Sequence, residues 1–390
     1  MISFDEAVSL VLDAARPTVS EPVAIAKAAG RVLAEPVVAM IDSPPADCSA
    51  MDGYAVRDSD VPGRLRIIGE SFAGAGHEGS LEPNTAIRIF TGAPVPDGAD
   101  RVVVQEVVER DGDMAVITET LGKARHIRRR GSDFHVGDLL LPAGRRLDPR
   151  ALVAAAGADL AEVEVWRRPS VTILGTGDEL APPGEARHRA GTIPESVSFG
   201  VAALVEQYGA LSLGTCRLAD DLPAMEKAAG RALDQSDLVV VTGGASVGEK
   251  DFAKAMFERH GLRLIFAKVA IKPGKPVWLG EAGGKLVMGL PGNPTSAMVT
   301  ARLLLAPLIA GLCGSRGALN WRRIRLAAAL PACGDRETFH RARLEEAGAA
   351  LVSNPDSSAQ KALAEADLLI RSRPNDPARE AGEEIEAIDF

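Results

Sequence analysis

The sequence predicts a multidomain fold of α/β and β-rich parts, organised around a doubly wound, mostly parallel α/β domain. A chain of 390 residues exceeds one ordinary hydrophobic core, since a domain usually takes about 150 residues. Near-continuous apolar runs alternate with helical patterns between residues 169 and 312, which is typical of a parallel sheet covered on both faces. Short β-branched runs rich in Gly and Pro lie before and after this region and indicate β-rich modules.

Helical spacing is found at both ends of the N-terminal part. Apolar residues recur every three or four positions in residues 4–15 and 23–34, so two helices are expected there. Residues 148–162 return to this pattern, with Asp148 as the N-cap and Pro149 at the first helical position. Between these segments the chain carries β-branched runs such as LRIIG, TAIRIF and RVVVQEVV.

These changes of pattern divide the chain into four predicted domains. A mostly helical linking domain is discontinuous, because a β-rich domain is inserted into it. The α/β domain and a small C-terminal β-domain follow. The predicted boundaries are 1–38 with 138–168 for the linking domain, 39–137 for the inserted domain, 169–314 for the α/β domain and 315–390 for the last.

Composition and charge narrow the range of functions. The net charge of −9 argues against a broad nucleic-acid surface, and the basic run 128–130 is either a solvated loop or faces an anion. The four cysteines form no CxxC pair, which argues against a zinc site and favours a reducing compartment. The N-terminus lacks the features of a signal peptide, and the apolar stretch 295–313 is interrupted by Arg302 and Pro307. We therefore expect a cytoplasmic protein without nucleic-acid or membrane partners.

Acidic residues and helix starts follow the predicted parallel strands, at the edge where open α/β sheets bind ligands. The N–H groups at a helix start attract anions, whereas carboxylates repel an anion unless a hard cation lies between them. Mg²⁺ meets this need, because one or two carboxylates and phosphate oxygens hold it. The residues concerned are Asp178, Glu179, Asp220, Asp221, Asp251 after a glycine-rich loop, and Thr295 and Ser296 after PGNP.

Two familiar nucleotide motifs are incomplete in this chain. GTGDEL has Leu180 where a dinucleotide fingerprint has its third Gly, and GGASVGEK has Glu249 where a P-loop has Lys. Positive charge comes instead from Lys268, Lys272 and Lys275. Strand alternation places Lys268 and Lys272 on one face. The alternative for these lysines is an ordinary edge strand that they protect.

Seven motifs, in this order, resemble those of the molybdopterin molybdenumtransferase family, the MoeA and gephyrin E-domain group. They are SAMDGYAVR, IFTGAPVPDGADRVV, IRRRGSD, GTGDEL, TGGASVGEKDF, AIKPGKP and GLPGNPTSA. The resemblance covers essentially the whole chain and implies that the α/β domain 169–314 is of the molybdopterin-binding type. It implies an elongated homodimer with four domains per chain and an active cleft shared between subunits. It also implies the last step of molybdenum cofactor biosynthesis: molybdenum from molybdate enters adenylylated molybdopterin, and AMP is released in the presence of Mg²⁺.

The resemblance implies roles for individual residues. Metal-binding or phosphate-orienting carboxylates are implied at Glu179, Asp220 and Asp251. The three lysines named above are implied to hold phosphate and molybdate. The β-rich domain of a partner subunit is implied to contribute Asp52, Thr91 and Asp133, although Asp52 also suits a plain Asp-Gly turn.

Further residues are implied to bind the pterin substrate. Glycines of the TGGASVGEKDF loop permit close approach of the backbone to the ligand. The implied set is Gly243, Gly244, Ser246 and Gly248 in that loop, and Pro291, Gly292, Pro294 and Ser296 in the PGNP loop. In the last domain, Arg341 and Ser358, or alternatively Ser357, are implied to bind molybdate beside the lysines.

One loop departs from the family pattern. GTIPESVSFG stands where the family has a stretch like GQIYDSN, so Pro194, Glu195 and Val197 replace Tyr, Asp and Asn, while Ser196 is kept. The departure motivates an alternative function, that of a catalytically weak or inactive molybdopterin-binding carrier or scaffold. A third hypothesis is an adenylyltransferase, which would not need the β-rich domain. The implied protein partners are the molybdopterin adenylyltransferase and the apoproteins of molybdoenzymes.

Overall fold

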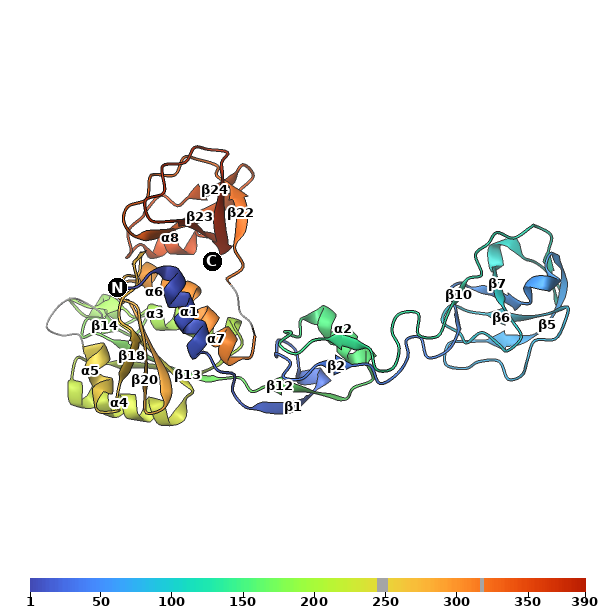
Figure 1. Ribbon diagram of the computed structural model, residues 1–390, viewed down its shortest axis with the longest axis horizontal. Helices are drawn as coiled ribbons and strands as arrows, with labels where there is room; N and C mark the ends of the chain where they lie inside the picture. The colour runs from blue at the N-terminus through green and yellow to red at the C-terminus, as the bar shows by residue number, and fades with distance from the viewer. Residues whose placement is uncertain (244–251, 316–318) are drawn as a thin grey trace.

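The chain forms an elongated molecule with compact parts at both ends (Figure 1). The computed structural model describes residues 1–243, 252–315 and 319–390. A β-rich domain forms one end, a small linking region lies in the middle, and the α/β and C-terminal domains lie together at the other end. The predicted multidomain α/β plus β fold is confirmed.

The α/β domain is built on one six-stranded sheet. Strand β13 pairs with β16 on one side and with β17 on the other, and β17 pairs with β21, all in parallel. Two antiparallel strands complete the sheet, so it is mostly parallel as predicted. In spatial order the strands are β16 (Leu211–Leu218), β13 (Ser170–Thr176), β17 (Leu238–Thr242), β21 (Lys285–Leu290), β20 (Trp278–Ala282) and β18 (Arg263–Phe266).

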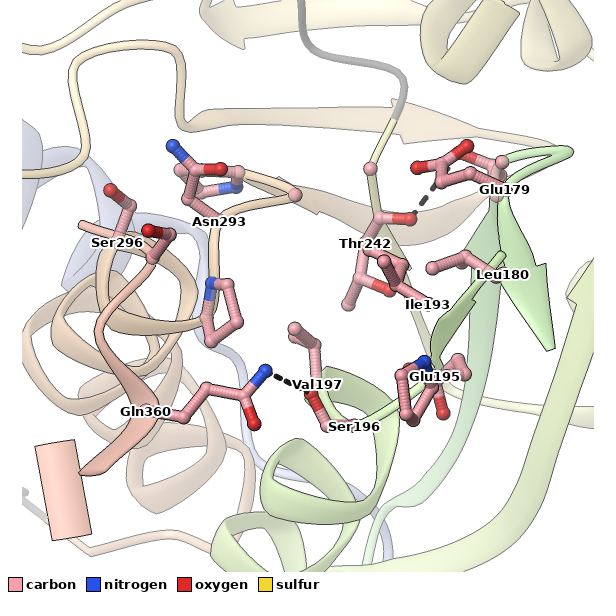
Figure 2. Close-up of a pocket in the computed structure, with 18 of the residues that line it drawn as sticks. Glu179, Leu180, Ile193, Glu195, Ser196, Val197, Thr242, Asn293, Ser296 and Gln360 are labelled. Atoms are coloured by element: carbon pink, nitrogen blue, oxygen red, sulfur yellow. Dashed lines mark hydrogen bonds between the residues drawn. The ribbon is translucent and has the colours of Figure 1, made fainter. Parts of the chain in front are cut away.

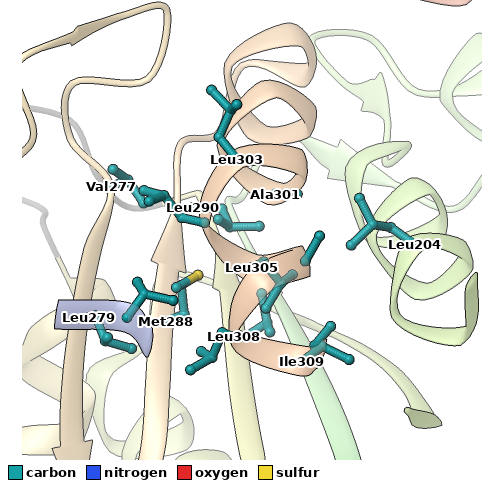
Figure 3. Packing of buried hydrophobic residues seen from close by; sticks show 14 of the residues in the cluster. Leu204, Val277, Leu279, Met288, Leu290, Ala301, Leu303, Leu305, Leu308 and Ile309 are labelled. Carbon is teal, nitrogen blue, oxygen red and sulfur yellow. The ribbon is translucent and has the colours of Figure 1, made fainter. Parts of the chain in front are cut away.

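Helices cover both faces of this sheet, which explains the uninterrupted apolar run of β17. Leu238 and Val240 pack in one core with α3, α6 and α7, as Figure 3 shows for this face. Val239 and Val241 pack in a second core with α4 and α5. A strand with one face in water would instead alternate apolar and polar residues. The helices are α3 (Val197–Gln207), α4 (Leu222–Gln235), α5 (Phe252–Glu258), α6 (Pro294–Thr300) and α7 (Ala306–Leu312).

The most apolar segment of the chain is a core helix of this domain. Residues Pro294–Leu312 run through α6, a π-helical turn (Ala301–Leu305) and α7. Within the described part of the chain this is the one helix long and apolar enough to cross a membrane, yet 83% of its most apolar window is buried in the fold. Its apolarity is therefore explained by packing against the sheet.

Helix α1 (Phe4–Ala14) packs against α7 of the α/β domain. Its N-cap is Ser3, whose hydroxyl accepts a hydrogen bond from the backbone N–H of Glu6 at 3.2 Å. The Phe4 ring meets Phe339 of the C-terminal domain edge-on, with 4.8 Å between ring centroids. The helix predicted over residues 4–15 is confirmed, but it joins the α/β and C-terminal domains instead of the linking region.

The helix predicted over residues 23–34 is wrong. Strand β1 (Ser20–Ala24) is followed by the short 3-10 helix η1 (Ile25–Lys27), and Gly30 then adopts a left-handed φ of 73°. Pairing of β1 with β12 (Glu162–Trp166), and of β2 (Val37–Val38) with β11 (Leu139–Leu141), outweighs the weak helical propensity of the segment. The linking region is therefore less helical than predicted.

The third expected helix of the N-terminal part is present. Helix α2 (Pro149–Gly157) begins after Asp148, whose carboxylate accepts a hydrogen bond from the backbone N–H of Ala151 at 2.8 Å. Pro149 occupies the first helical position, where its missing N–H costs nothing. The predicted N-cap is confirmed.

Two further sheets make the β-rich and C-terminal domains. The first has the order β7 (Arg101–Val104), β4 (Gly53–Val56), β6 (Thr85–Ile89), β5 (Gly63–Ser71), β9 (Met114–Ile117) and β8 (Glu109–Asp111). The second has the order β19 (Ile271–Lys272), β23 (Glu337–Glu345), β25 (Leu368–Ser372), β26 (Glu384–Asp389) and β22 (Arg322–Arg325), and β24 (Gly348–Leu351) pairs with β23.

The strand predicted through Lys268 and Lys272 is interrupted. Strand β18 ends at Phe266, and Lys272 belongs to β19, which pairs in parallel with β23 of the C-terminal domain. The two lysines therefore do not share one face of a continuous strand. The change of sheet explains why simple alternation failed here.

An ion pair fixes the α/β domain to the linking region. Both terminal nitrogens of Arg167 donate to the two carboxylate oxygens of Asp237 at 3.0 Å. The backbone N–H and the hydroxyl of Ser170 also donate to Asp237, at 2.8 and 2.9 Å. Burial by itself would raise the pKa of Asp237, but the bonds from Arg167 and Ser170 outweigh it and lower that pKa.

Substitution Asp237→Asn is expected to lower the free energy of unfolding by about 2 kcal/mol at pH 7, because it weakens four hydrogen bonds to a charged group. The folded-state pKa lies below that of an unfolded chain, so the carboxylate stabilises the fold above about pH 4 and the effect is lost as the pH falls through the folded pKa. The measurement is urea denaturation followed by circular dichroism at pH 7 and pH 3.5. Exposed Asp234, in the last turn of α4 and three residues before Asp237, is changed to Asn as the control. An equal loss at both pH values would contradict this assignment.

Candidate functional site

A cavity of about 790 Å³ lies beyond the carboxyl ends of the parallel strands. Thr176 ends β13 and Thr242 ends β17, and both line the cavity. The chain leaves β13 toward β16 on one side and returns to β17 on the other, so the strand order reverses between these two strands. Such a switch point opens a crevice in which α/β folds bind ligands. The sequence predicted a ligand at this rim.

Glycines allow two loops to approach each other at the base of the cavity. Gly243 has a φ of 90°, and a Cβ there would lie 2.4 Å from the carbonyl oxygen of Thr176. A Cβ on Gly292 would lie 3.3 Å from the Cα of Gly243. Gly243, Gly292, Pro291, Pro294 and Ser296 of the predicted set all line the cavity. The predicted residues Gly244, Ser246, Gly248 and Asp251 lie outside the described residues.

Two predicted carboxylates come together at this cavity. Glu179 follows β13 and Asp220 follows β16, and both line the wall. Asp178 accepts a hydrogen bond from the backbone N–H of Asp220 at 3.0 Å, which ties the two loops together. Across residues 1–243, 252–315 and 319–390, no group of three His, Cys, Asp or Glu side chains is arranged to hold a metal. Glu179 and Asp220 are the two predicted metal ligands that the structure describes, and two carboxylates suit a metal ion that also binds substrate oxygens.

The departing loop GTIPESVSFG forms another wall of the cavity. Glu195 is 7% exposed, and its carboxylate accepts a hydrogen bond from the backbone N–H of Ser198 at 2.8 Å, at the start of α3. Gln360, from the C-terminal domain, donates from Nε2 to the Ser196 hydroxyl at 3.3 Å (Figure 2). Sequence reasoning missed Gln360, because nothing in its local pattern indicates a contact 164 residues away.

The C-terminal domain supplies the remaining wall through residues 354–360. The Asn293 side chain donates to the Ser357 hydroxyl at 2.9 Å, and Ser358 lines the cavity. Both the backbone N–H and the hydroxyl of Ser358 donate to Asp356, which lowers the pKa of that carboxyl. Of the two serines that sequence reasoning left open, Ser358 is the one that faces the cavity.

Arg341 holds this loop in place. The side chain is 6% exposed and donates to the Thr295 hydroxyl and to the backbone carbonyls of Asn354, Asp356 and Ala359, at 2.7 to 3.3 Å. It does not line the cavity. In this arrangement Arg341 positions the loop and does not reach a ligand, which differs from the direct contact implied by the sequence.

The three lysines lie in the segment between β18 and β20, which reaches the cavity at Pro276. Lys268, Lys272 and Lys275 are exposed, and none lines the cavity, whereas the neighbouring Pro276 does. The backbone carbonyl of Lys275 accepts from the N–H of Val269 at 3.1 Å, so Lys268 and Lys275 lie at the base of one closed loop. The structure brings these two lysines near each other, outside the cavity wall.

The β-rich domain carries a second group of predicted residues. Asp52 accepts from both the backbone N–H and the hydroxyl of Thr91, each at 2.8 Å, and these bonds lower the pKa of Asp52. Asp133 is exposed, and its backbone N–H donates to Ser43. Asp52 and Thr91 adjoin β4 and β6, at the opposite end of the molecule from the cavity (Figure 1). Asp52 and Thr91 therefore meet each other, but within one chain they do not meet the cavity.

The basic run of this region has local acidic partners. Arg129 pairs with Asp47 and Arg130 pairs with Asp42, each at 2.5 Å. Both contacts bridge the two chain segments that enter and leave the β-rich domain. These pairs favour a structural role for Arg129 and Arg130 over an anion-facing one.

Comparison with known proteins gives the family. Family models match residues 2–158 (MoeA N-terminal region, domain I and II), 172–311 (probable molybdopterin binding domain) and 323–390 (MoeA C-terminal region, domain IV). A molybdopterin molybdenumtransferase from Haemophilus influenzae is 40% identical over 83% of this chain and 80% of its own length. One from Nostoc sp. is 34% identical over 80% and 74%.

A solved structure shares the whole architecture. The molybdopterin biosynthesis moeA protein from Pyrococcus horikoshii OT3 is 27% identical, and each chain covers 100% of the other, with a TM-score of 0.87. The fold and its switch-point cavity thus define a transferase of molybdenum cofactor biosynthesis. The chain belongs to the molybdopterin molybdenumtransferase family.

Substitution Gly243→Ala is expected to destabilise the α/β domain more than Gly261→Ala does. Both glycines have a left-handed φ, which costs an alanine about 1 to 2 kcal/mol. Only at Gly243 does the new methyl group also meet a backbone carbonyl, because Gly261 faces open space. Urea denaturation of both variants compares the two costs. Equal midpoints for the two variants would show that the loops at Gly243 are not closely packed.

Proposed function

We propose that this cavity binds adenylylated molybdopterin and molybdate, inserts molybdenum into the dithiolene and releases AMP. The observation that carries the proposal is the convergence of Glu179, Asp220 and the close-packed Gly243 and Gly292 loops at one switch-point cavity. Its volume suits a ligand of this size, since ligand sites usually enclose about 300 to 1,000 Å³.

Mg²⁺ fits the residues present. Glu179 and Asp220 offer two hard oxygen donors on one wall, and Mg²⁺ in phosphoryl-transfer sites binds through one or two carboxylates together with substrate phosphates. When bound, the ion polarises phosphoryl oxygens and neutralises their charge. The carboxylates orient the phosphoanhydride, and the closely packed loops at Gly243 and Gly292 border one side of it.

The other polar groups of the wall divide the remaining tasks. Ser296 and the second side-chain N–H of Asn293 offer hydrogen bonds to an anionic ligand. Arg341 holds the loop that carries Ser358 on the cavity wall. Lys268 and Lys275, at the base of the adjoining loop, are suited to attract molybdate toward the cavity.

We further propose a homodimer in which the β-rich domain of one chain completes the cavity of the other. The distance between Asp52 and the cavity within one chain supports this arrangement (Figure 1). Exposed apolar side chains also support an interface, because such groups cluster where proteins associate. They include Val38, Met40, Ile41, Val136 and Leu139, which lie around the paired strands β2 and β11. A cytoplasmic location, and contact with the adenylyltransferase and with molybdoenzyme apoproteins, belong to the same proposal.

Substitution Asp220→Asn is expected to lower AMP release from adenylylated molybdopterin by 100-fold or more, on the order of what an electrostatic group in an active site supplies. The assay contains molybdate and Mg²⁺, and AMP is measured by chromatography. Asp221→Asn is the matched control, because Asp221 is exposed, adjoins Asp220 and does not line the cavity.

The same assay separates the alternatives. Equally slow AMP release by the wild type and by Asp220→Asn would favour a carrier or scaffold, the function motivated by the Pro194–Val197 departure. Formation of adenylylated molybdopterin from ATP and free molybdopterin would favour an adenylyltransferase. The wild type is expected to release AMP and to show no such adenylylation.

Mixing Asp52→Ala with Asp220→Ala is expected to restore activity, because a mixed dimer holds one cavity with both residues intact. Random exchange of subunits predicts recovery of roughly a quarter of wild-type activity, since half of the dimers are mixed and each has one complete site. The measurement is AMP release after denaturation and co-refolding, with dimer composition checked by differently tagged chains. Verified mixed dimers without activity would place each site within a single chain.

A further inference from the structure

Two chemically different regions of the cavity lie at the two ends of a short strand pair, which we call the ribbon. Strands β14 (Leu180–Ala181) and β15 (Ile193–Pro194) pair in parallel, with Leu180 opposite Ile193. Glu179 directly precedes β14 and Glu195 directly follows β15. In this register the two carboxylate residues are three positions apart along the ribbon, which is roughly 10 Å. Leu180 and Ile193 lie between them (Figure 2).

The Glu195 region suits a flat ring. Leu180, Ile193 and Val197 provide apolar contacts there, and all three line the cavity. Fused aromatic heterocycles bind in such apolar slots when a few polar groups at the edge fix their orientation. The Glu179 region, by contrast, has the second carboxylate Asp220 and the glycine loops, which suit phosphates.

The Glu195 carboxylate is fixed in place but not fully used by the protein. One oxygen accepts the backbone N–H of Ser198, and the backbone N–H of Glu195 donates to Ala181 at 2.8 Å. A carboxylate has about four acceptor positions. In the parts of the chain that the structure describes, no Lys or Arg pairs with Glu195. Because Glu195 lines the cavity, its unused positions can accept N–H donors from a ligand there.

Helix capping alone does not explain a glutamate at this position. Ser196 is the N-cap of α3, yet its hydroxyl makes no cap bond and instead accepts from Gln360. Glu195 takes over the capping bond with one oxygen, and its second oxygen remains for the cavity. Because Gln360 of the C-terminal domain binds the Ser196 hydroxyl, Glu195 caps α3 in its place. The same carboxylate can still accept a hydrogen bond from a ligand in the cavity.

Resting on the proposed function, we propose that Glu195 determines specificity by accepting the 2-amino and ring N3–H donors of the pterin. Hydrogen bonds from such N–H groups to a carboxylate are charge-assisted. Replacing the 2-amino group by oxygen removes one of the two bonds, leaves N3–H in place and turns an oxygen acceptor toward the carboxylate. The pterin ring lies over Leu180 and Ile193, and its phosphate substituent extends toward Glu179 and Asp220. This orientation gives the two carboxylate regions separate tasks, ring recognition and phosphate positioning.

The test compares two probes that differ at one atom, 6-hydroxymethylpterin phosphate and the corresponding lumazine, in which oxygen replaces the 2-amino group. Binding to the full chain is measured by quenching of ligand fluorescence. The wild type is expected to bind the pterin at least 10-fold more tightly than the lumazine. Glu195→Gln is expected to reduce this preference to less than twofold, because its amide can cap α3 but presents an N–H toward the ring donors.

Asp148→Asn is the control for loss of a capping carboxylate, since Asp148 caps α2 far from the cavity. It is expected to keep the full preference. A preference that survives in Glu195→Gln overturns the proposal, as does a wild type that binds both probes equally or neither. The AMP-release assay with Asp220→Asn is independent of this comparison. Failure there together with a Glu195-dependent preference would reject turnover and retain pterin recognition.

Discussion

Strand β13 lies between β16 and β17, and the walls of the cavity depend on this placement. The chain adds β16 on one side of β13, and then crosses back and adds β17 and β21 on the other side. This single reversal of direction places helices on both faces of the sheet. The loops after the four parallel strands then diverge around one crevice. Gly243 and Gly292 close its base, since a Cβ on either would press against a neighbouring backbone. Packing of the core thus determines where the polar groups of the site are found.

The C-terminal domain completes the cavity, and a buried ion cluster holds it against the α/β domain. Arg371 binds Glu337 within the C-terminal sheet and Asp5 at the start of α1, and its guanidinium lies 5.1 Å from the centre of the Phe4 ring. Burial raises the pKa of Glu337, although the bond from Arg371 opposes that rise. Glu337 and Arg371 are thus an ion pair shielded from water, unlike a solvent-exposed pair on the surface. Because α1 also packs on α7, this cluster fixes the domain that presents Ser358 and Gln360 to the cavity.

Much of the fold was predictable from the spacing of apolar residues. Much of the site was predictable from the polar residues that follow the predicted parallel strands. The apolar run of β17 indicated a sheet covered on both faces, and Glu179 and Asp220 were expected at the rim where they lie. Residues 23–34 were mispredicted because pairing of β1 with a distant strand outweighs helical spacing. Gln360, and the role of Arg341 in holding a loop, escaped prediction for a related reason. Their partners, Thr295 and Ser196, belong to another domain, and no short motif records such contacts.

The negative charge of the cavity wall requires positive partners for an anionic substrate. The described wall contains Glu179, Glu195 and Asp220 but no Lys, Arg or His. An adenylylated pterin is itself anionic, so these walls alone would repel it. Under the proposed function, Mg²⁺ offsets the charge near Glu179 and Asp220, while the N–H donors of the ring satisfy Glu195 without any cation. Molybdate is the other anionic substrate, and Mg²⁺ at Glu179 and Asp220 is assigned to the phosphates. The exposed lysines beside the cavity are then the cations available to bind molybdate.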